Sequence, residues 1–453
     1  MHTHDAGLSR RGFLGAISLP APAIALAGHA PLAVPTRHAR SLLNELAAHA
    51  GAFTPDDLAR DEDFWTQIAR AYTIDRSIVN LNNGGVSPSS AYVQDAMKRA
   101  LDETNRMPPP YELWQVAPKK REAIRERLAR EWDVDAEELA ITRNASEGLQ
   151  ALQFGIDLKP GDEVLTTYHD YPRMLNTFRQ RGRREGIVLR QFDIPTPCED
   201  DDEIVRRFAD NITDRTRMIL ISHMVFLTGQ VLPVAKVGAL GRERGIPVIV
   251  DGAHAFAHVP FTLGELGCDY YATSLHKWLG APHGTGLLYV NRDKIEGVWS
   301  LMASDQTQAS DIRKFEEIGT HPAANFLAIA EALTMHQAIG DERKLARLVY
   351  LRDRWAHRLA GMDRVTLRTS LKPGFAGGIA TVDIEGVEPG AVASHLWNEH
   401  RIFAVAIKDV SDENVRRSGV VGLRVSPNVY TTLEEIDRFA DAMERIIKRG
   451  LPA

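Results

Sequence analysis

An aspartate and a lysine each follow an apolar segment of this 453-residue chain. Residues 246–250 are typical of a buried strand and end directly on Asp251, while the strand-like segment 269–273 leads through a short turn to Lys277. Ligands of open α/β sheets bind outside the carboxyl ends of the strands, so we expect this carboxylate and this amine to lie close together. Pyridoxal 5′-phosphate (PLP) requires such a pair, because a lysine forms its Schiff base and an acid keeps its pyridine nitrogen protonated.

Each of these two residues also has a plainer interpretation. Lys277 alone would be read as a solvated lysine in a turn, and Asp251 alone as the cap of a helix. A hydroxyl and an imidazole flank the lysine, at Ser274 and His276, and a glycine-containing return strand follows at 284–290. The combination favours a PLP site.

The segment 251–286, DGAHAFAHVPFTLGELGCDYYATSLHKWLGAPHGTG, resembles the class V aminotransferase family of fold-type I PLP enzymes. The resemblance extends from about residue 80 to about residue 430, and the isopenicillin N epimerase-like branch is nearest in pattern. It implies an α/β fold, with a large domain built on a mostly parallel sheet of the seven-stranded type and a smaller C-terminal α+β domain. The predicted parts are a signal peptide (1–30), a helical segment packed on the small domain (31–75), the large PLP-binding domain (76–340) and the small domain (341–453).

Composition agrees with a folded enzyme and excludes some other classes. Hydrophobic residues make up 44% of the chain and charged residues 25%, as in globular proteins. The net charge of −6 leaves no basic surface for nucleic acid, and no segment after residue 30 is apolar and long enough to span a membrane. We therefore expect a small-molecule substrate of the amino-acid type, and no membrane span in the mature chain.

The first 30 residues predict export. Residues 9–14, SRRGFL, form a twin-arginine pattern, an apolar stretch follows at 13–27, and residues 25–27 offer a small-residue cleavage site. The alternative is a frayed basic tail ahead of a helix. Export by the twin-arginine translocation machinery moves folded proteins, which suits an enzyme that acquires PLP in the cytoplasm, so a periplasmic or otherwise exported location is predicted.

Strand–helix alternation in the middle of the chain should position the cofactor. Strands are expected at 139–142, 163–167 and 218–222, and later at 365–368, 379–384, 402–406 and 422–426, with a last helix at 433–449. A helix opening near Ala145 and Ser146 would present backbone N–H groups and a hydroxyl to the phosphate, although a plain helix cap uses the same groups. Ala145 occupies the position where desulfurases have a hydroxyl residue, so at this position only the backbone N–H group can contact the phosphate.

The family resemblance assigns several further residues. Tyr171 is expected to stack on the pyridine ring, with His169 as second candidate and a core tyrosine as the alternative. Ser274 and His276 resemble the family's phosphate ligands. Thr320 resembles a threonine that reaches the phosphate of a neighbouring subunit, which implies a homodimer with shared active sites, although a helix cap explains it equally.

Substrate contacts are expected from two further positions. Arg424 lies in an apolar strand, where an unpaired charge is costly, so a bidentate grip on a substrate carboxylate or an internal salt bridge should explain it. Asn83 belongs to a glycine-rich turn that the resemblance places at the mouth of the site; a plain turn is the alternative.

A histidine near the aspartate is also expected to take part. Desulfurases carry a polar residue near the position of Phe226 that contacts the phenolic oxygen of the cofactor. Because Phe226 cannot make this contact, His254 becomes the candidate for it. His254 and His258 have a metal-like i, i+4 spacing, but no third ligand is evident and no metal is predicted.

The predicted reaction takes place at the α-carbon of an amino acid or an amino-acid-containing small molecule, as in an epimerase, aminotransferase or lyase. Its catalytic residues would be Lys277, Asp251 and His254, with Lys277 as the proton shuttle. Cysteine desulfuration is not expected. In the resembled family that activity needs a cysteine on a loop shortly before the strand of Arg424, and residues 408–419 contain none. The alternatives are a periplasmic enzyme that tailors a siderophore or peptide side group, and a non-catalytic binding protein on the same scaffold. Selectivity is expected from the loops 106–114 and 409–417.

Overall fold

The computed structural model describes residues 37–408 and 418–451, which belong to one compact unit, Ala33–Ala453. The predicted signal peptide, 1–30, lies outside the described residues, as does the expected selectivity loop 409–417. Within the described part, no helix is long and apolar enough to cross a membrane.

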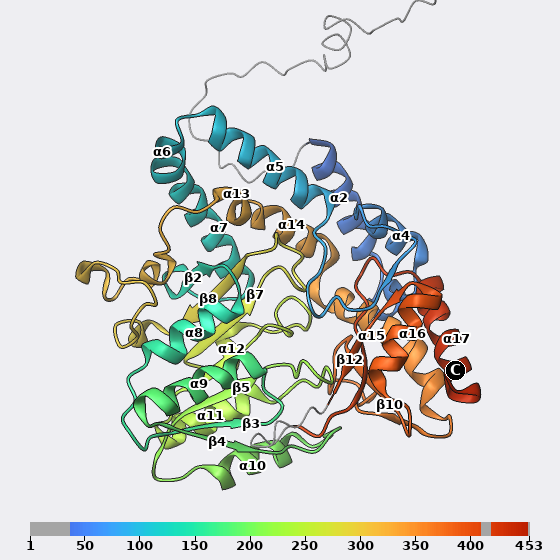
Figure 1. The fold of residues 1–453 in the computed structure, drawn as a ribbon. Helices are drawn as coiled ribbons and strands as arrows, with labels where there is room; N and C mark the ends of the chain where they lie inside the picture. Colours follow the sequence, from blue (N-terminus) through green and yellow to red (C-terminus); the bar gives the residue numbers. More distant parts are fainter. Residues whose placement is uncertain (1–36, 409–417, 452–453) are drawn as a thin grey trace, which may run out of the picture. The chain divides into compact units, whose positions relative to one another are not determined.

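A seven-stranded sheet forms the centre of the larger part of the chain (Figure 1). Its strands lie in the order β2-β8-β7-β6-β5-β3-β4. Strand β8 runs antiparallel to the other six, which are parallel to one another. This arrangement confirms the predicted mostly parallel sheet. The strands are β2 (Leu139–Thr142), β3 (Glu163–Thr167), β4 (Val188–Phe192), β5 (Thr216–Ser222), β6 (Val248–Asp251), β7 (Tyr270–Ser274) and β8 (Gly286–Val290).

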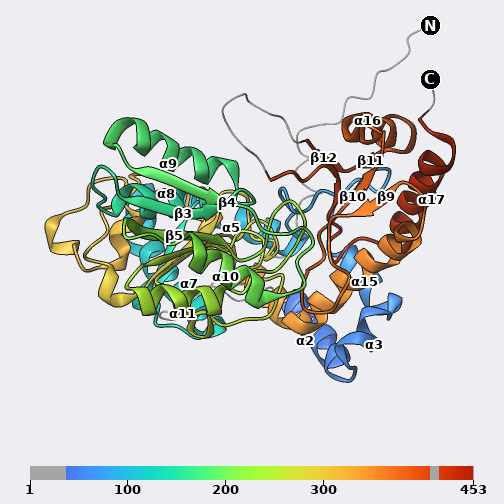
Figure 2. The ribbon, with the colours of Figure 1, turned by 90° about the horizontal axis from the view of Figure 1, so that it is seen from below.

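Helices cover both faces of this sheet, as the sequences of its inner strands require. Every residue of β6 and of β7 is buried, which is typical of parallel strands enclosed on both sides. Figure 2 shows one helical layer formed by α8 (Ala145–Gly155) and α9 (Pro172–Glu185). The opposite layer contains α7 (Ala117–Glu131), α10 (Asp201–Asn211) and α11 (Val234–Arg244).

The start of α8 is set by a local cap directly after β2. Asn144 has an extended backbone, and its side chain accepts a hydrogen bond from the Glu147 N–H at 2.8 Å. Such a cap satisfies one of the free N–H groups at a helix start. The first turn of α8 is thereby held at the carboxyl edge of the sheet.

A smaller, antiparallel sheet is built from the C-terminal part of the chain, in the order β12-β13-β10-β9. Its strands are β9 (Val365–Leu367), β10 (Ala380–Ile384), β12 (Val405–Ile407) and β13 (Gly422–Val425), and α15 (Asp341–Ala360), α16 (Pro389–His400) and α17 (Leu433–Arg449) pack against them. Trp355 and Phe439 meet edge to face in this core, at 5.4 Å between ring centres. The predicted strands and last helix are thus present.

One predicted strand of this region, 402–406, proves to be two. Ile402 and Phe403 form β11 (Ile402–Phe403), which pairs in parallel with β1 (Val79–Asn80) instead of joining the four-stranded sheet. The chain then crosses at Ala404 and continues as β12. The apolar character of the segment is the same throughout, so only the pairing partners separate the two strands.

The N-terminal helices are α2 (Arg37–Gly51), α3 (Pro55–Ala59) and α4 (Glu62–Arg70). This part of the predicted helical segment 31–75 is divided between α3 and α4 because Asp61 caps α4, accepting from the N–H groups of Asp63 and Phe64. Arg347 of α15 donates to the Ala59 carbonyl at 2.9 Å and pairs with Glu62 at 2.5 Å. These contacts join the N-terminal helices to α15; the predicted domain boundaries stay predictions.

Two helices follow irregular turns. Before α5 (Ala91–Arg106), the Ser87 hydroxyl donates to the Asn83 carbonyl at 3.1 Å and closes a turn. A π-helical turn, Glu112–Val116, comes directly before α7.

Candidate active site

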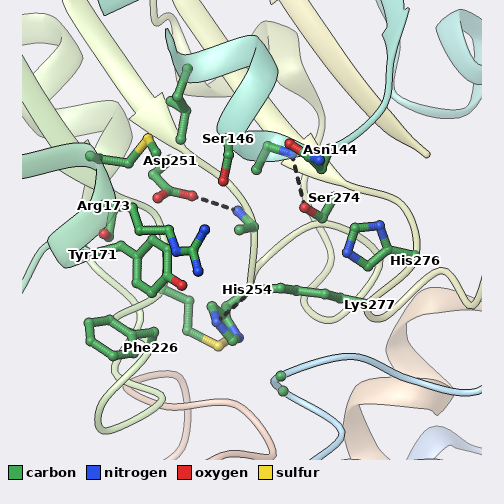
Figure 3. Close-up of a pocket in the computed structure, with 18 of the residues that line it drawn as sticks. Asn144, Ser146, Tyr171, Arg173, Phe226, Asp251, His254, Ser274, His276 and Lys277 are labelled. Carbon is green, nitrogen blue, oxygen red and sulfur yellow. Dashed lines mark hydrogen bonds between the residues drawn. The ribbon is translucent and has the colours of Figure 1, made fainter. Parts of the chain in front are cut away.

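A cavity of about 410 Å³ opens at the carboxyl ends of β5, β6 and β7, beside the first turn of α8 (Figure 3). Residues of the smaller sheet, from β12 and β13, complete its wall. Nine of the predicted site residues line it: Ala145, Ser146, Tyr171, Asp251, His254, Ser274, His276, Lys277 and Arg424. The cavity therefore needs both sheets.

Lys277 reaches the cavity from the turn after β7. Its Nζ atom lies 3.0 Å from Nε2 of His254. The side chain is partly exposed to the cavity, but burial among protein atoms lowers the pKa of the ammonium group to about 8, despite the opposing effect of Asp251. An amine with this pKa is partly neutral near neutral pH and can act as a nucleophile.

Asp251 is the last residue of β6 and is 7% exposed. Its Oδ1 atom accepts a hydrogen bond from the Ala253 N–H at 3.0 Å. Burial raises the pKa of this carboxyl from 3.8 to about 6, while the Ala253 N–H and the positive charge of Lys277 oppose the rise. Burial destabilises the ionised form of this carboxyl group, and a cationic partner such as a protonated ring nitrogen would stabilise it.

His254 is held neutral and lacks one partner. Burial, followed by the positive charge of Lys277, lowers the pKa of its imidazole well below the ordinary value. Its Nδ1 atom is buried and has no hydrogen-bond partner among the residues that the structure describes. His258 differs, because its Nδ1 atom meets the His254 carbonyl at 3.0 Å and its Nε2 atom accepts from the Gly378 N–H at 2.7 Å. His258 thus has a structural environment.

The other side of the cavity is lined by hydroxyl and imidazole groups. The Ser274 hydroxyl accepts from the Ala145 N–H at 2.9 Å, which leaves this backbone donor already paired and corrects the expectation that it serves the cofactor directly. His276 contacts the Thr285 carbonyl through Nδ1 at 3.1 Å, and burial lowers the pKa of its ring to about 4. The Ser146 side chain extends toward the same space (Figure 3).

An aromatic pair forms a further part of the wall. Tyr171, the N-cap residue of α9, is 37% exposed and meets Phe226 edge to face, at 5.3 Å between ring centres. His169, the second candidate for the stacking position, is 2% exposed and is not among the cavity residues. The structure therefore places Tyr171, of these two, against the cavity.

Arg424 enters the cavity from β13. Its guanidinium group donates to the Phe226 carbonyl at 3.0 Å and to the Asn82 side chain at 2.8 Å. Burial lowers its pKa to about 10, and its Nε atom is buried without a partner. Within the described ranges, 37–408 and 418–451, no carboxylate forms an ion pair with it, so the internal salt bridge considered from the sequence is not found there.

Asn83, predicted to bind substrate, requires correction. It is fully buried, and its side chain donates to the Ser426 and Asn80 carbonyls, at 3.0 Å each, and accepts from the Tyr430 hydroxyl at 2.5 Å. With its polar atoms used in this way, it stabilises the turn and does not line the cavity.

Two other predicted features lie elsewhere. Thr320 lines a separate cavity, together with Trp114, so within one chain it does not reach the cofactor site; its predicted contact with a neighbouring subunit stays a prediction. The loop 106–114, expected to shape substrate entry, likewise contributes no residue to the site of Lys277.

Sequence reasoning missed several residues of the site. Arg173 lies two residues after Tyr171 at the start of α9, and its place just after the end of a strand was the available signal. Asn82 does not line the cavity, but its side chain accepts a hydrogen bond from Arg424. Val405 and Ile407 of β12 also line the cavity, and no local signal distinguishes them from core residues.

These groups match what PLP requires. Asp251 is the acid for the ring nitrogen, Lys277 is the amine for the aldehyde, and His254 has a buried nitrogen that lacks a partner. Hydroxyl and imidazole side chains, from Ser146, Ser274 and His276, together with the start of α8, provide donors for a phosphate. The residues present therefore fit the cofactor.

Known proteins resemble the chain over most of its length. The model of the family "Aminotransferase class-V" matches residues 79–439. An isopenicillin N epimerase of Streptomyces clavuligerus is 31% identical over 407 residues, which cover 84% of this chain and 98% of that protein. A cysteine desulfurase of Haloferax volcanii is 28% identical, over 68% of this chain and 74% of that protein.

The fold is shared as well. The apo structure of a cysteine desulfurase from Thermococcus onnurineus superimposes with a TM-score of 0.71 at 21% identity, and covers 85% of this chain and 98% of that one. The match over residues 79–439 and the residues of the cavity together establish PLP as the cofactor. The chain belongs to the class V aminotransferase family and is a PLP-dependent enzyme.

Proposed function

We propose that this enzyme acts at the α-carbon of an amino acid, or of a small molecule that contains one, and that it moves the α-proton through Lys277. The observation that carries the proposal is the placement of Lys277 and Arg424 in one cavity, with the pKa of Lys277 lowered to about 8. When bound, PLP supplies an aldehyde that condenses with amines and a ring that accepts electrons from a bond broken at the α-carbon.

Each residue of the cavity has its own role in the proposed reaction. Arg424 is fixed by Asn82 and Phe226, so its guanidinium group can bind and orient the α-carboxylate of a substrate. Asp251 keeps the ring nitrogen charged. Lys277 then holds the proton taken from the α-carbon, and His254, at 3.0 Å from its Nζ atom, positions it.

Among reactions of this type, we favour epimerisation. The relative from Streptomyces clavuligerus, an isopenicillin N epimerase, is 31% identical and is covered to 98% of its length. Inversion requires that a proton return to the face of the α-carbon opposite the one from which it left, and the net reaction consumes no further reactant. Aminotransferase and lyase reactions share the removal of the α-proton and differ in their later steps.

Cysteine desulfuration remains outside the proposal, although desulfurases are among the relatives. The chain has two cysteines, Cys198 and Cys268, both free and buried, and neither is among the cavity residues. Burial raises the pKa of the Cys268 thiol to about 12, and a thiol in that state is a weak nucleophile. The burial of both thiols away from the cavity supports leaving desulfuration out of the proposal.

Reduction with borohydride after loading with PLP tests the proposal directly. We expect the cofactor to become fixed to Lys277, as read by mass spectrometry of the peptides. Lys344 is an internal control, because it is also buried and its pKa is lowered to about 7, but it does not line the cavity. Label on Lys344, or no label, would overturn the assignment.

Exchange of the α-proton in heavy water tests the reaction. We expect NMR to detect loss of the α-hydrogen signal, and inversion at the α-carbon, for a substrate amino acid. Exchange without inversion would exclude an epimerase and leave the other reactions of the class.

We also propose export by the twin-arginine pathway, on the pattern at residues 9–14. Conversion of Arg10 and Arg11 to lysine should retain the protein in the cytoplasm, as measured by cell fractionation. A periplasmic location of that variant would contradict the proposal.

A further inference from the structure

Arg173 is a cationic residue of the cavity that the proposed reaction does not use. It lies in the first turn of α9, two residues after Tyr171, and it lines the same cavity as Lys277. Figure 3 shows its guanidinium group directed into the cavity beside the Tyr171 ring. A side chain so placed can contact whatever molecule the cavity holds.

The guanidinium group of Arg173 has no partner among the described residues. No side-chain hydrogen bond, ion pair or ring contact there involves it. Two other arginines of the same helix are paired: Arg181 donates to Glu185 at 2.7 Å and Arg184 to the same carboxylate at 2.8 Å. The free donors of Arg173 are therefore available to a ligand.

The charges of the cavity do not balance without a ligand that is strongly anionic. Apart from His254 and His276, whose pKa values burial lowers, its described lining contains three cationic side chains, Arg173, Lys277 and Arg424, and a single carboxylate, Asp251. Asp251 is needed for the ring nitrogen and Lys277 for the aldehyde. Two guanidinium groups remain, and each matches one carboxylate.

Arg173 lies away from the part of the cavity that suits a phosphate (Figure 3). Ser274 and His276 lie on the opposite side of the cavity from Arg173 and Tyr171 (Figure 3). The hydroxyl groups, the imidazole and the start of α8 gather on that opposite side. A cofactor phosphate bound there leaves Arg173 for the substrate.

We propose that Arg173 determines substrate specificity, by binding a second acidic group on the side chain of the substrate while Arg424 binds the α-carboxylate. The inference rests on the proposed function, since it assigns a substrate class to the same site: amino acids, or larger molecules containing one, whose side chain ends in an anionic group. Apolar lining residues, such as Val405 and Ile407, can contact the hydrocarbon part of such a side chain.

Matched amino acids test this with the PLP-loaded enzyme. Glutamate and glutamine differ by one charge at equal size, so both enantiomers of each are titrated while the visible absorption of the cofactor is followed. We expect wild type to bind glutamate about tenfold more tightly than glutamine or better, as one charge-assisted contact provides. Arg173→Gln should remove that preference by weakening glutamate binding alone, and Arg173→Lys should keep part of it.

Two control variants separate this effect from others. Arg183→Gln removes an exposed positive charge from the same helix, outside the cavity, and should leave the preference unchanged. Titration of each apoprotein with PLP shows whether Arg173 serves the cofactor instead. An affinity for PLP that falls about tenfold in Arg173→Gln would make it a cofactor ligand and overturn the inference.

The remaining outcomes are also decisive. Glutamate binding that is no tighter than glutamine binding in wild type, including the case in which neither changes the spectrum, contradicts the inference. A preference that survives in Arg173→Gln does so too. Failure of the proposed function is a different result, because the cofactor would then not become fixed to Lys277 on reduction.

Discussion

The buried and the exposed residues of the cavity have different environments. Asp251 and His254 are at most 7% exposed, and burial displaces their pKa values. Tyr171 is 37% exposed, and Arg173 beside it is exposed and, among the described residues, has no protein partner. The buried pair lies at and just after the carboxyl end of β6, whereas the exposed pair lies at the start of α9.

This difference separates reactivity from selectivity. Low exposure makes charge interactions strong and sets the protonation states that a proton transfer needs. Exposed groups interact more weakly but can change without disturbing the core. We therefore expect substitutions of the buried residues to affect the reaction with every substrate. Substitutions of the exposed residues should affect the choice among substrates.

The largest effect is expected from Lys277→Ala. Loss of the amine removes both the attachment of the cofactor and the proton carrier, so turnover should fall by about a thousandfold or more. Rates of α-proton exchange in heavy water measure this. Lys294→Ala, an exposed lysine outside the cavity, is the matched control, and retention of wild-type exchange by Lys277→Ala would place the reaction elsewhere.

The pH dependence of stability tests the buried carboxylate. Because the folded apoprotein raises the pKa of Asp251 from 3.8 to about 6, the native state binds more protons than the unfolded state between these values. The contribution of Asp251 to the stability of the apoprotein should therefore fall as pH rises through this window, by up to about 3 kcal/mol. Buried histidines such as His254 and His276, whose pKa values are lowered, act in the opposite direction, so a variant is needed to isolate the contribution of Asp251. Urea unfolding at pH 4 and pH 7 measures the change.

Asp251→Asn is the comparison for that measurement. It lacks the titrating group, so its stability relative to wild type should rise by up to about 3 kcal/mol between pH 4 and pH 7, because wild type alone loses the contribution of the protonated carboxyl group. An identical pH dependence in both proteins would show that the carboxyl group is not destabilised by burial.

An intermediate effect is expected from Arg424, which is buried and is proposed to bind the substrate's α-carboxylate. Arg424→Gln should weaken the binding of glutamate and glutamine alike, by about 10- to 100-fold, while the cofactor still becomes fixed to Lys277. Because this change also leaves Asn82 and the Phe226 carbonyl without their donor, Arg424→Lys serves as a second variant. A selective loss of glutamate binding would exchange the roles of Arg424 and Arg173.

The smallest effect is expected from salt. Exposed ion pairs are screened more than buried ones, so raising the ionic strength from about 0.05 M to about 0.5 M should reduce the preference for glutamate by about two- to fivefold. Binding of glutamine, which relies on buried Arg424, should change less. Equal salt dependence of the two ligands would indicate that both acidic groups are bound in the interior.

Much of the site was predictable because it follows strand ends. Asp251, Ser274 and Lys277 each come at or just after the end of a buried apolar run, and parallel strands bring such ends to one edge of a sheet. Arg424 was predictable for a different reason, since a charge in an apolar strand requires a partner.

The errors have physical causes that local sequence does not contain. Asn82 and Asn83 are adjacent residues of one type, and only the folded turn directs Asn83 to the Ser426 carbonyl and Asn82 to the Arg424 guanidinium. The break between β11 and β12 likewise depends on pairing with β1, far away in the chain.

The sequence by itself determined the order of strands and helices, the acid–lysine pair and the residues suited to a phosphate, because periodicity, caps and strand ends are local properties. Only the tertiary structure decided that Arg424 approaches Lys277 and that Arg173 lies in the same cavity, unpaired among the described residues. Those positions depend on contacts between the two sheets, and contacts between distant segments are set by packing rather than by any local pattern.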